Sequence, residues 1–260
     1  MADFDELVTE GMTEPFSGWD FSWLDRHSQT GPLPWDYPAR VAALAGTARA
    51  MLDMGTGGGE ALSRLMTRAT RTVATEAWPP NVPVAARRLR PLGIPVVQDQ
   101  GARDNMDQDG ANDGGHLPFR DGSLDLICNR HESFLAAEVS RVLAPGGTFV
   151  TQQVDYHEND DLARVLGIET PDEPESWIGL AERQLADAGL VIEEAVRAEQ
   201  RVGFDDVAGL VYYLKAISWS IPGYSLDKHR DRLRALYDDP GAWPVVTRGR
   251  RFLLIASKPG

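Results

Sequence analysis

The stretch that decides the fold is Leu52-Asp53-Met54-Gly55-Thr56-Gly57-Gly58-Gly59-Glu60. The apolar residues before the glycines predict a strand, and the residues after them predict a helix. Glycine accepts positive φ and lets a ligand approach the backbone closely. The free N–H groups of such a turn, with the helix N-terminus behind them, can meet a polar or anionic part of a ligand. The stretch therefore predicts a ligand-binding turn in an α/β protein.

The glycine spacing separates this turn from two common nucleotide-binding turns. A dinucleotide fingerprint requires Gly-x-Gly-x-x-Gly, and counted from Gly55 its last glycine would fall on Glu60. A carboxylate there would repel a diphosphate, so a nicotinamide-dependent oxidoreductase is disfavoured. The turn is not followed by Gly-Lys-Ser/Thr, so it is not a P-loop.

Outward from the turn, residues 50–202 alternate β-like and α-like segments, the pattern of a parallel sheet with crossover helices. A late strand that lacks its own crossover helix is expected to pair antiparallel. The expected strands are 50–53, 71–76, 94–97, 124–128, 148–154, 190–202 and, antiparallel, 251–257. The polar segment 98–116 is expected to be a long loop.

Two regions outside the alternation are rich in aromatic residues. We expect an N-terminal cap segment (1–45), a core (46–202), a largely helical cap or substrate insertion (203–248) and a final core strand (249–260). The two aromatic regions are expected to form a helical cap over the carboxyl ends of the strands, where open α/β sheets bind ligands. The alternative is that most of these aromatics are ordinary core.

Composition narrows the classes of function. The 260-residue chain carries a formal net charge of −13 and a single cysteine, Cys128. The charge disfavours nucleic-acid binding, which needs cations to displace phosphate counterions. No clustered His and Cys spacing indicates a metal, and no apolar run approaches a membrane span. We expect a cytoplasmic protein without metal or membrane association, either a monomer or a homodimer.

Three further features follow the glycine turn in chain order. Glu76 closes the second expected strand, 21 residues after Gly55. An acidic residue there can accept hydrogen bonds from both ribose hydroxyls, as in the dinucleotide fold. The segment Leu117-Pro118-Phe119-Arg120-Asp121-Gly122-Ser123-Leu124-Asp125 leads into the fourth strand, and Glu138-Val139-Ser140-Arg141-Val142-Leu143-Ala144-Pro145-Gly146-Gly147 leads into the fifth.

Together these motifs resemble the class I S-adenosylmethionine-dependent methyltransferases, in particular the ubiquinone/menaquinone-biosynthesis (type 11) family. The resemblance spans about residues 50–154. It implies a Rossmann-like α/β fold with a seven-stranded, mostly parallel sheet, helices on both faces, and S-adenosylmethionine as cofactor. The residues that it places at the cofactor are Asp53, Gly55, Thr56, Gly57, Gly59, Glu76, Ala77, Trp78, Asp99, His116, Leu117, Asn129 and Arg130.

The acceptor side is less defined by sequence. His131 follows the fourth strand at the expected catalytic edge and is the candidate general base, although Arg130-His131-Glu132 could also be an ordinary helix start. The candidate substrate-binding residues are Trp19, Tyr37, His131, Tyr212 and Trp219. Apolar pockets suit small organic ligands, so the expected acceptor is a small molecule. The alternatives are an rRNA or tRNA base methyltransferase, or a non-catalytic regulator that binds the cofactor.

Overall fold

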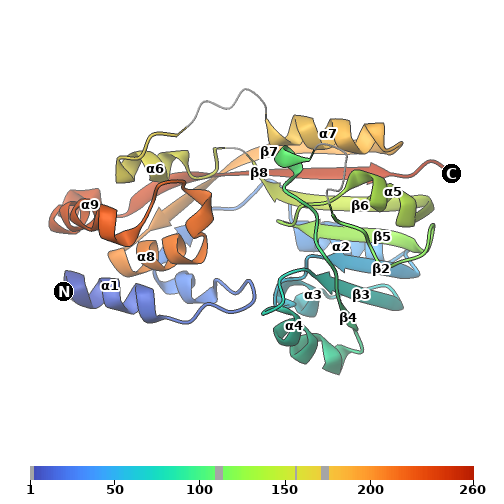
Figure 1. Cartoon of the computed structure of the whole chain (residues 1–260), viewed down its shortest axis with the longest axis horizontal. Coiled ribbons are helices and arrows are strands. Elements are labelled where there is room, and N and C mark those ends of the chain that lie inside the picture. Colours follow the sequence, from blue (N-terminus) through green and yellow to red (C-terminus); the bar gives the residue numbers. More distant parts are fainter. Residues whose placement is uncertain (1–2, 109–113, 156, 171–175) are drawn as a thin grey trace.

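Two lobes joined by a pair of long strands make up the computed structural model, which describes residues 3–108, 114–155, 157–170 and 176–260. The strands β7 (Val191–Phe204) and β8 (Val245–Ser257) run side by side through both lobes (Figure 1). One lobe holds the central sheet, which we call the core lobe. The other, the cap lobe, gathers helices from both ends of the chain around the far ends of β7 and β8.

Among the described residues, the sheet has eight strands in the order β1-β7-β8-β6-β5-β2-β3-β4. The strands β2 (Ala50–Met54), β3 (Arg71–Glu76), β4 (Val96–Gln98), β5 (Leu124–Arg130) and β6 (Leu143–Val154) pair parallel to one another, and β8 is antiparallel to both of its neighbours. The expected mostly parallel α/β sheet with an antiparallel last strand is confirmed.

The expected strand number of seven is too low by one. The additional strand, β1 (Ser28–Thr30), pairs antiparallel with the end of β7. This strand is only three residues long and all of them are polar, so it lacks the alternation of apolar side chains that would predict a strand. Its pairing depends on β7, which lies far away in the sequence.

Helices cover both faces of the core lobe, as expected. On one face α2 (Tyr37–Ala45), α3 (Glu60–Arg64) and α4 (Val82–Leu89) bury apolar side chains against the sheet. On the other face α5 (Ala136–Val142) and α7 (Trp177–Asp187) do the same. The helix α2 lies in the segment expected to belong to the cap, yet Val41 and Ala45 pack in the core lobe.

The cap lobe has its own apolar core. It is built from α1 (Phe4–Thr13), α6 (Asp160–Leu166), α8 (Val207–Ala216) and α9 (Leu226–Asp238), whose buried side chains include Phe4, Leu162, Leu210 and Leu233. The helical character expected for residues 203–248 is therefore found, whereas α6 joins the cap from a segment expected to be core. Short 3₁₀ helices lie at η1 (Ser22–Arg26), η2 (Arg90–Leu92), η3 (Asn105–Asp107), η4 (Ser218–Ser220) and η5 (Pro240–Ala242). Within the described ranges, none of the helices has the length and apolar character that a membrane crossing requires.

Candidate cofactor site

The glycine turn joins β2 to α3 at the carboxyl edge of the sheet. Gly55, Gly57 and Gly59 have φ values of 69°, 62° and 80°, in the left-handed region that favours glycine. A Cβ at Gly59 would lie 2.9 Å from Leu89 Cγ, so this glycine lets α3 approach α4. The turn thus needs glycine both for its backbone conformation and for packing.

Asp53, in β2, is hydrogen-bonded to the glycine turn. Thr56 Oγ1 donates a hydrogen bond to Asp53 Oδ2 at 2.7 Å, and Thr56 N donates to Thr75 O at 2.9 Å. Burial raises the pKa of Asp53 to about 6, although the bond from Thr56 opposes that shift. Asp53 therefore holds the turn in place through Thr56.

Glu76 ties β3 to the same turn. Its side chain is 5% exposed, and its two carboxylate oxygens accept hydrogen bonds from Gly57 N at 2.6 Å and Trp78 N at 2.8 Å. Burial raises its pKa, while these two backbone donors act in the opposite direction. The carboxylate expected to hold a ribose is therefore placed directly beside the middle of the glycine turn.

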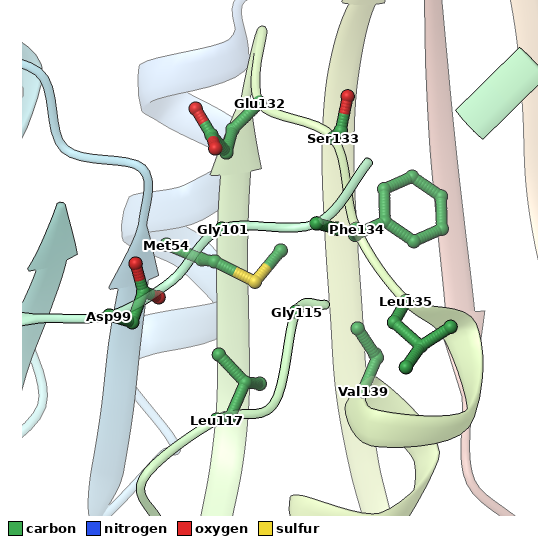
Figure 2. Close-up of a pocket in the computed structure, with 11 residues that line it drawn as sticks. Met54, Asp99, Gly101, Gly115, Leu117, Glu132, Ser133, Phe134, Leu135 and Val139 are labelled. Atoms are coloured by element: carbon green, nitrogen blue, oxygen red, sulfur yellow. The ribbon is translucent and has the colours of Figure 1, made fainter. Parts of the chain in front are cut away.

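Residues that follow β4 and β5 complete a hollow beside the glycine turn (Figure 2). Asp99, just after β4, donates its N–H to Glu76 O at 3.3 Å, and burial raises the pKa of its carboxyl group. Ala77 lies against Gly101, while Trp78 is 64% exposed. The hollow is lined by Met54, Asp99, Gly101, Ala102, Gly115, Leu117, Glu132, Ser133, Phe134, Leu135 and Val139.

Glu132 is the functional candidate that sequence analysis missed. The sequence offered it as a helix start, but α5 begins only at Ala136, so Glu132 lies in the connection after β5 and enters the hollow. Burial raises its pKa to about 7, with further contributions from Glu76 and Asp99. Its position after a strand end, at the same sheet edge as the glycine turn, was the available signal.

The two remaining motifs brace the wall of the hollow. Glu138 accepts a hydrogen bond from Leu117 N at 2.9 Å and pairs with Arg141 at 2.7 Å. Arg141 in turn donates to the carbonyl oxygens of Leu117 and Phe119. His116, expected at the cofactor, is exposed and lies 3.6 Å from Glu138. Leu117 lines the hollow, so these motifs position it rather than supply reactive groups. Residues 109–113 of the expected loop lie outside the described residues.

The end of β5 carries a buried polar network. Asn129 Oδ1 accepts from Thr151 Oγ1 at 2.8 Å and from Gln153 Nε2 at 2.5 Å. The hydroxyl of Tyr37 donates to Asn129 O at 2.9 Å, which places Tyr37 in the core lobe and apart from the cap aromatics. Arg130, the last residue of β5, is exposed.

His131 has two unusual properties. Its φ is 62°, a strained value for a residue other than glycine, and its Nδ1 is buried without a hydrogen-bond partner among the described residues. Burial lowers its pKa well below the usual value, and the nearby charges of Arg251 and Arg130 lower it further. The imidazole is therefore neutral near pH 7.

Aromatic side chains of the cap lobe reach the glycine turn. A Cβ at Gly57 would lie 2.9 Å from Trp19 Cβ, so Trp19 packs over the turn. The Trp19 ring lies 6.1 Å from that of Trp219, which is 66% exposed. Tyr212 is buried in the cap, and Phe16 links its ring to that of Trp19. Three of the expected substrate residues thus belong to one aromatic cluster: Trp19, Tyr212 and Trp219.

Comparison with known families and structures agrees with this geometry. Residues 52–151 match the family model described as a methyltransferase domain. Over residues 52–151 the chain is therefore similar to the methyltransferase domain family. S-adenosylmethionine is the cofactor of that family, and the methyltransferase fold carries the glycine turn and the Glu76 contact at the expected sheet edge. Among curated proteins, none matches the sequence.

Solved structures share the fold of this chain. A protein from Bacillus halodurans assigned as a methyltransferase is 19% identical with a TM-score of 0.55, covering 86% of this chain and 97% of that one. YcgJ from Bacillus subtilis is 15% identical with a TM-score of 0.52, covering 86% and 98%. A protein of unknown function from Deinococcus radiodurans is 16% identical with a TM-score of 0.53, covering 97% of both chains.

The residues present fit the cofactor. The glycine turn has no side chains of its own at Gly55 and Gly57, and the side chains of Glu132 and Trp19 lie directly over these two glycines. Glu76 lies within hydrogen-bond distance of that surface, as a ribose-binding carboxylate requires. The apolar side chains of Leu117 and Phe134 line the adjoining hollow. Among the described residues, no group of three His, Cys, Asp or Glu side chains has the arrangement of a metal site.

Proposed function

We propose that this methyltransferase transfers the methyl group of S-adenosylmethionine to a small organic acceptor that enters beside the aromatic cluster of the cap lobe. The observation that carries the proposal is the position of Trp19, which packs over Gly57 and against Trp219. An apolar aromatic surface at the cofactor turn favours an apolar or aromatic acceptor over a phosphate-rich one.

Methyl transfer requires mainly that the cofactor and the acceptor be aligned with each other. When bound, the cofactor supplies a methyl group already activated by its sulfonium. The glycine turn, Glu76 and the hollow would fix that end, while the cap aromatics would orient the acceptor and exclude water. Positioning of this kind can supply up to about 7–11 kcal/mol of the barrier reduction.

His131 is the proposed base for an acceptor that must lose a proton. It stays neutral near pH 7 because burial and two neighbouring guanidinium groups disfavour its cationic form. Its strained backbone and its unpartnered Nδ1 are features that cluster at functional sites. A general base of this type contributes roughly 10²–10⁴-fold to the rate.

The test is label transfer from methyl-tritiated S-adenosylmethionine in cell extracts that are separated by size and chemistry. Label in low-mass apolar or aromatic compounds supports the proposal. Label confined to RNA would instead favour the base-methyltransferase alternative, and cofactor binding without transfer to any fraction would favour a regulator. With the acceptor in hand, Trp219→Ala should raise its KM without changing affinity for S-adenosylhomocysteine.

A further inference from the structure

Glu132 lies where a bound cofactor would pass. The Cβ and Cγ atoms of Glu132 are each 2.4 Å from the position that a Cβ on Gly55 would occupy, so the side chain packs directly on that glycine. Figure 2 shows its carboxylate at the same side of the hollow as that of Asp99, with Phe134 and Leu135 on the other side. The acid therefore faces the site at the first glycine of the turn.

The charge around Glu132 is uncompensated. Its neighbours Glu76 and Asp99 are also acidic, and among the described residues none of the three carboxylates forms an ion pair with a cationic side chain. A buried charge without a partner costs free energy. The arrangement is stabilised if a ligand brings a positive charge into the hollow.

The cofactor has such a charge on its α-ammonium group, which would lie on the Gly55 side of the turn. Glu76, bound to Gly57, would hold the ribose, and Gly55 lies two residues back along the turn toward β2. In the cofactor, the α-amino-acid end lies beyond the sulfur, on the side away from adenine and ribose. An acceptor of positive charge at Gly55 is therefore placed for the α-ammonium group.

An independent observation supports an amino acid at this place. Asn129 is fully buried, yet its Nδ2 donor has no partner among the described residues. Gln153, which donates to Asn129 and to the backbone oxygen of Glu132, leaves its Oε1 unpartnered. Asn129 and the backbone of Glu132 thus share one hydrogen-bond network through Gln153, and an unused amide donor in that network complements the carboxylate of an α-amino-acid zwitterion.

We propose that Glu132 binds the α-ammonium group of the cofactor and is the residue that recognises its amino-acid end. The inference rests on the cofactor of the family and not on the acceptor proposed above. It adds a side-chain contact that is made equally with the substrate and product forms of the cofactor, because both carry the ammonium group.

The experiment is calorimetric titration of the full chain and its Glu132→Gln variant with three ligands. S-adenosylhomocysteine carries the ammonium and carboxylate groups, its decarboxylated analogue keeps only the ammonium, and 5′-methylthioadenosine has neither. Losing a hydrogen bond between charged groups should weaken the first two by at least about tenfold and leave 5′-methylthioadenosine within about twofold. The exposed Glu193→Gln on β7 is the matched control and should bind all three like wild type.

The outcomes separate the possibilities. Equal weakening of all three ligands, or unchanged or tighter binding of S-adenosylhomocysteine, overturns the role of Glu132 alone. Wild-type protein that binds no adenosyl ligand defeats the cofactor assignment and the inference together. Without ligand, Glu132→Gln should melt at the same or a higher temperature, because an unpaired buried charge is removed. A lower melting temperature accompanied by loss of all three ligands would show a merely structural residue.

Discussion

At the scale of single residues, Glu76 is the contact that joins sheet and cofactor turn. Because its carboxylate is shared between Gly57 N and Trp78 N, its removal leaves two backbone donors without their partner. We expect Glu76→Ala to weaken binding of S-adenosylhomocysteine by roughly 1–3 kcal/mol. Calorimetric titration measures this change, and the exposed Asp238→Asn at the end of α9 serves as a control. Affinity equal to that of wild type would remove Glu76 from the site.

The proposed role of Glu132 predicts that cofactor binding depends on pH. Its pKa of about 7 applies to the free protein, and an ammonium partner would lower it, so binding favours the deprotonated form. Affinity for S-adenosylhomocysteine should therefore be about tenfold higher at pH 8 than at pH 6. Titrations at three pH values measure the slope.

Three neighbouring carboxyl groups also contribute to the pH dependence of binding, and their contribution must be separated from that of Glu132. Glu76 and Asp99 face Glu132 and have raised pKa values, and Asp53 below the turn has a pKa of about 6. Their contribution persists in Glu132→Gln. We expect this variant to lose most of the rise between pH 6 and pH 8. An unchanged slope would assign the pH dependence to these other carboxyl groups.

At the scale of elements, the glycine turn combines backbone strain with close approach, and the two can be separated. Gly57 and Gly146 both have positive φ, but a Cβ at Gly57 would meet Trp19, whereas one at Gly146 meets nothing within 4 Å. Both Gly→Val variants should lose stability through strain. Only Gly57→Val should also abolish cofactor binding, as measured by titration at a temperature where both are folded. If Gly57→Val still bound the cofactor, the assignment of the glycine turn as the cofactor site would be wrong.

The elements also show what the sequence could predict. The glycine turn, Glu76 and the bracing motifs are local patterns, so their strands could be predicted from the sequence, and the resemblance to methyltransferases placed them together at the cofactor. The position of Glu132 did not, because helical periodicity extended the helix to a residue that the structure leaves in a loop before Ala136. Tyr37 was assigned to the acceptor side for its aromatic character, but its helix packs on the sheet. Contacts such as Trp19 on Gly57 depend on the packing of two lobes, which no local pattern records.

At the scale of the whole molecule, β7 and β8 make the lobes one mechanical unit. The two strands are paired from Val191 with Ser257 in the core lobe to Phe204 with Val245 in the cap lobe. If one lobe unfolds, its part of β7 and β8 unfolds with it. Backbone groups of the same two strands then become exposed in the other lobe. We therefore expect a single unfolding transition, with a ratio of calorimetric to van't Hoff enthalpy of about one. Scanning calorimetry measures that ratio, and two separated transitions would show independent lobes.

The position of β8 also bears on how the chain is made. This strand comes last in chain order but lies inside the sheet, between β6 and β7. During translation, every other strand leaves the ribosome before it, and until it emerges both β6 and β7 present unpaired edges. Such edges are templates for pairing with other chains. The nascent protein thus passes through a stage in which it depends on chaperones or on rapid completion to avoid aggregation, and a ribosome stalled before residue 245 would hold it there.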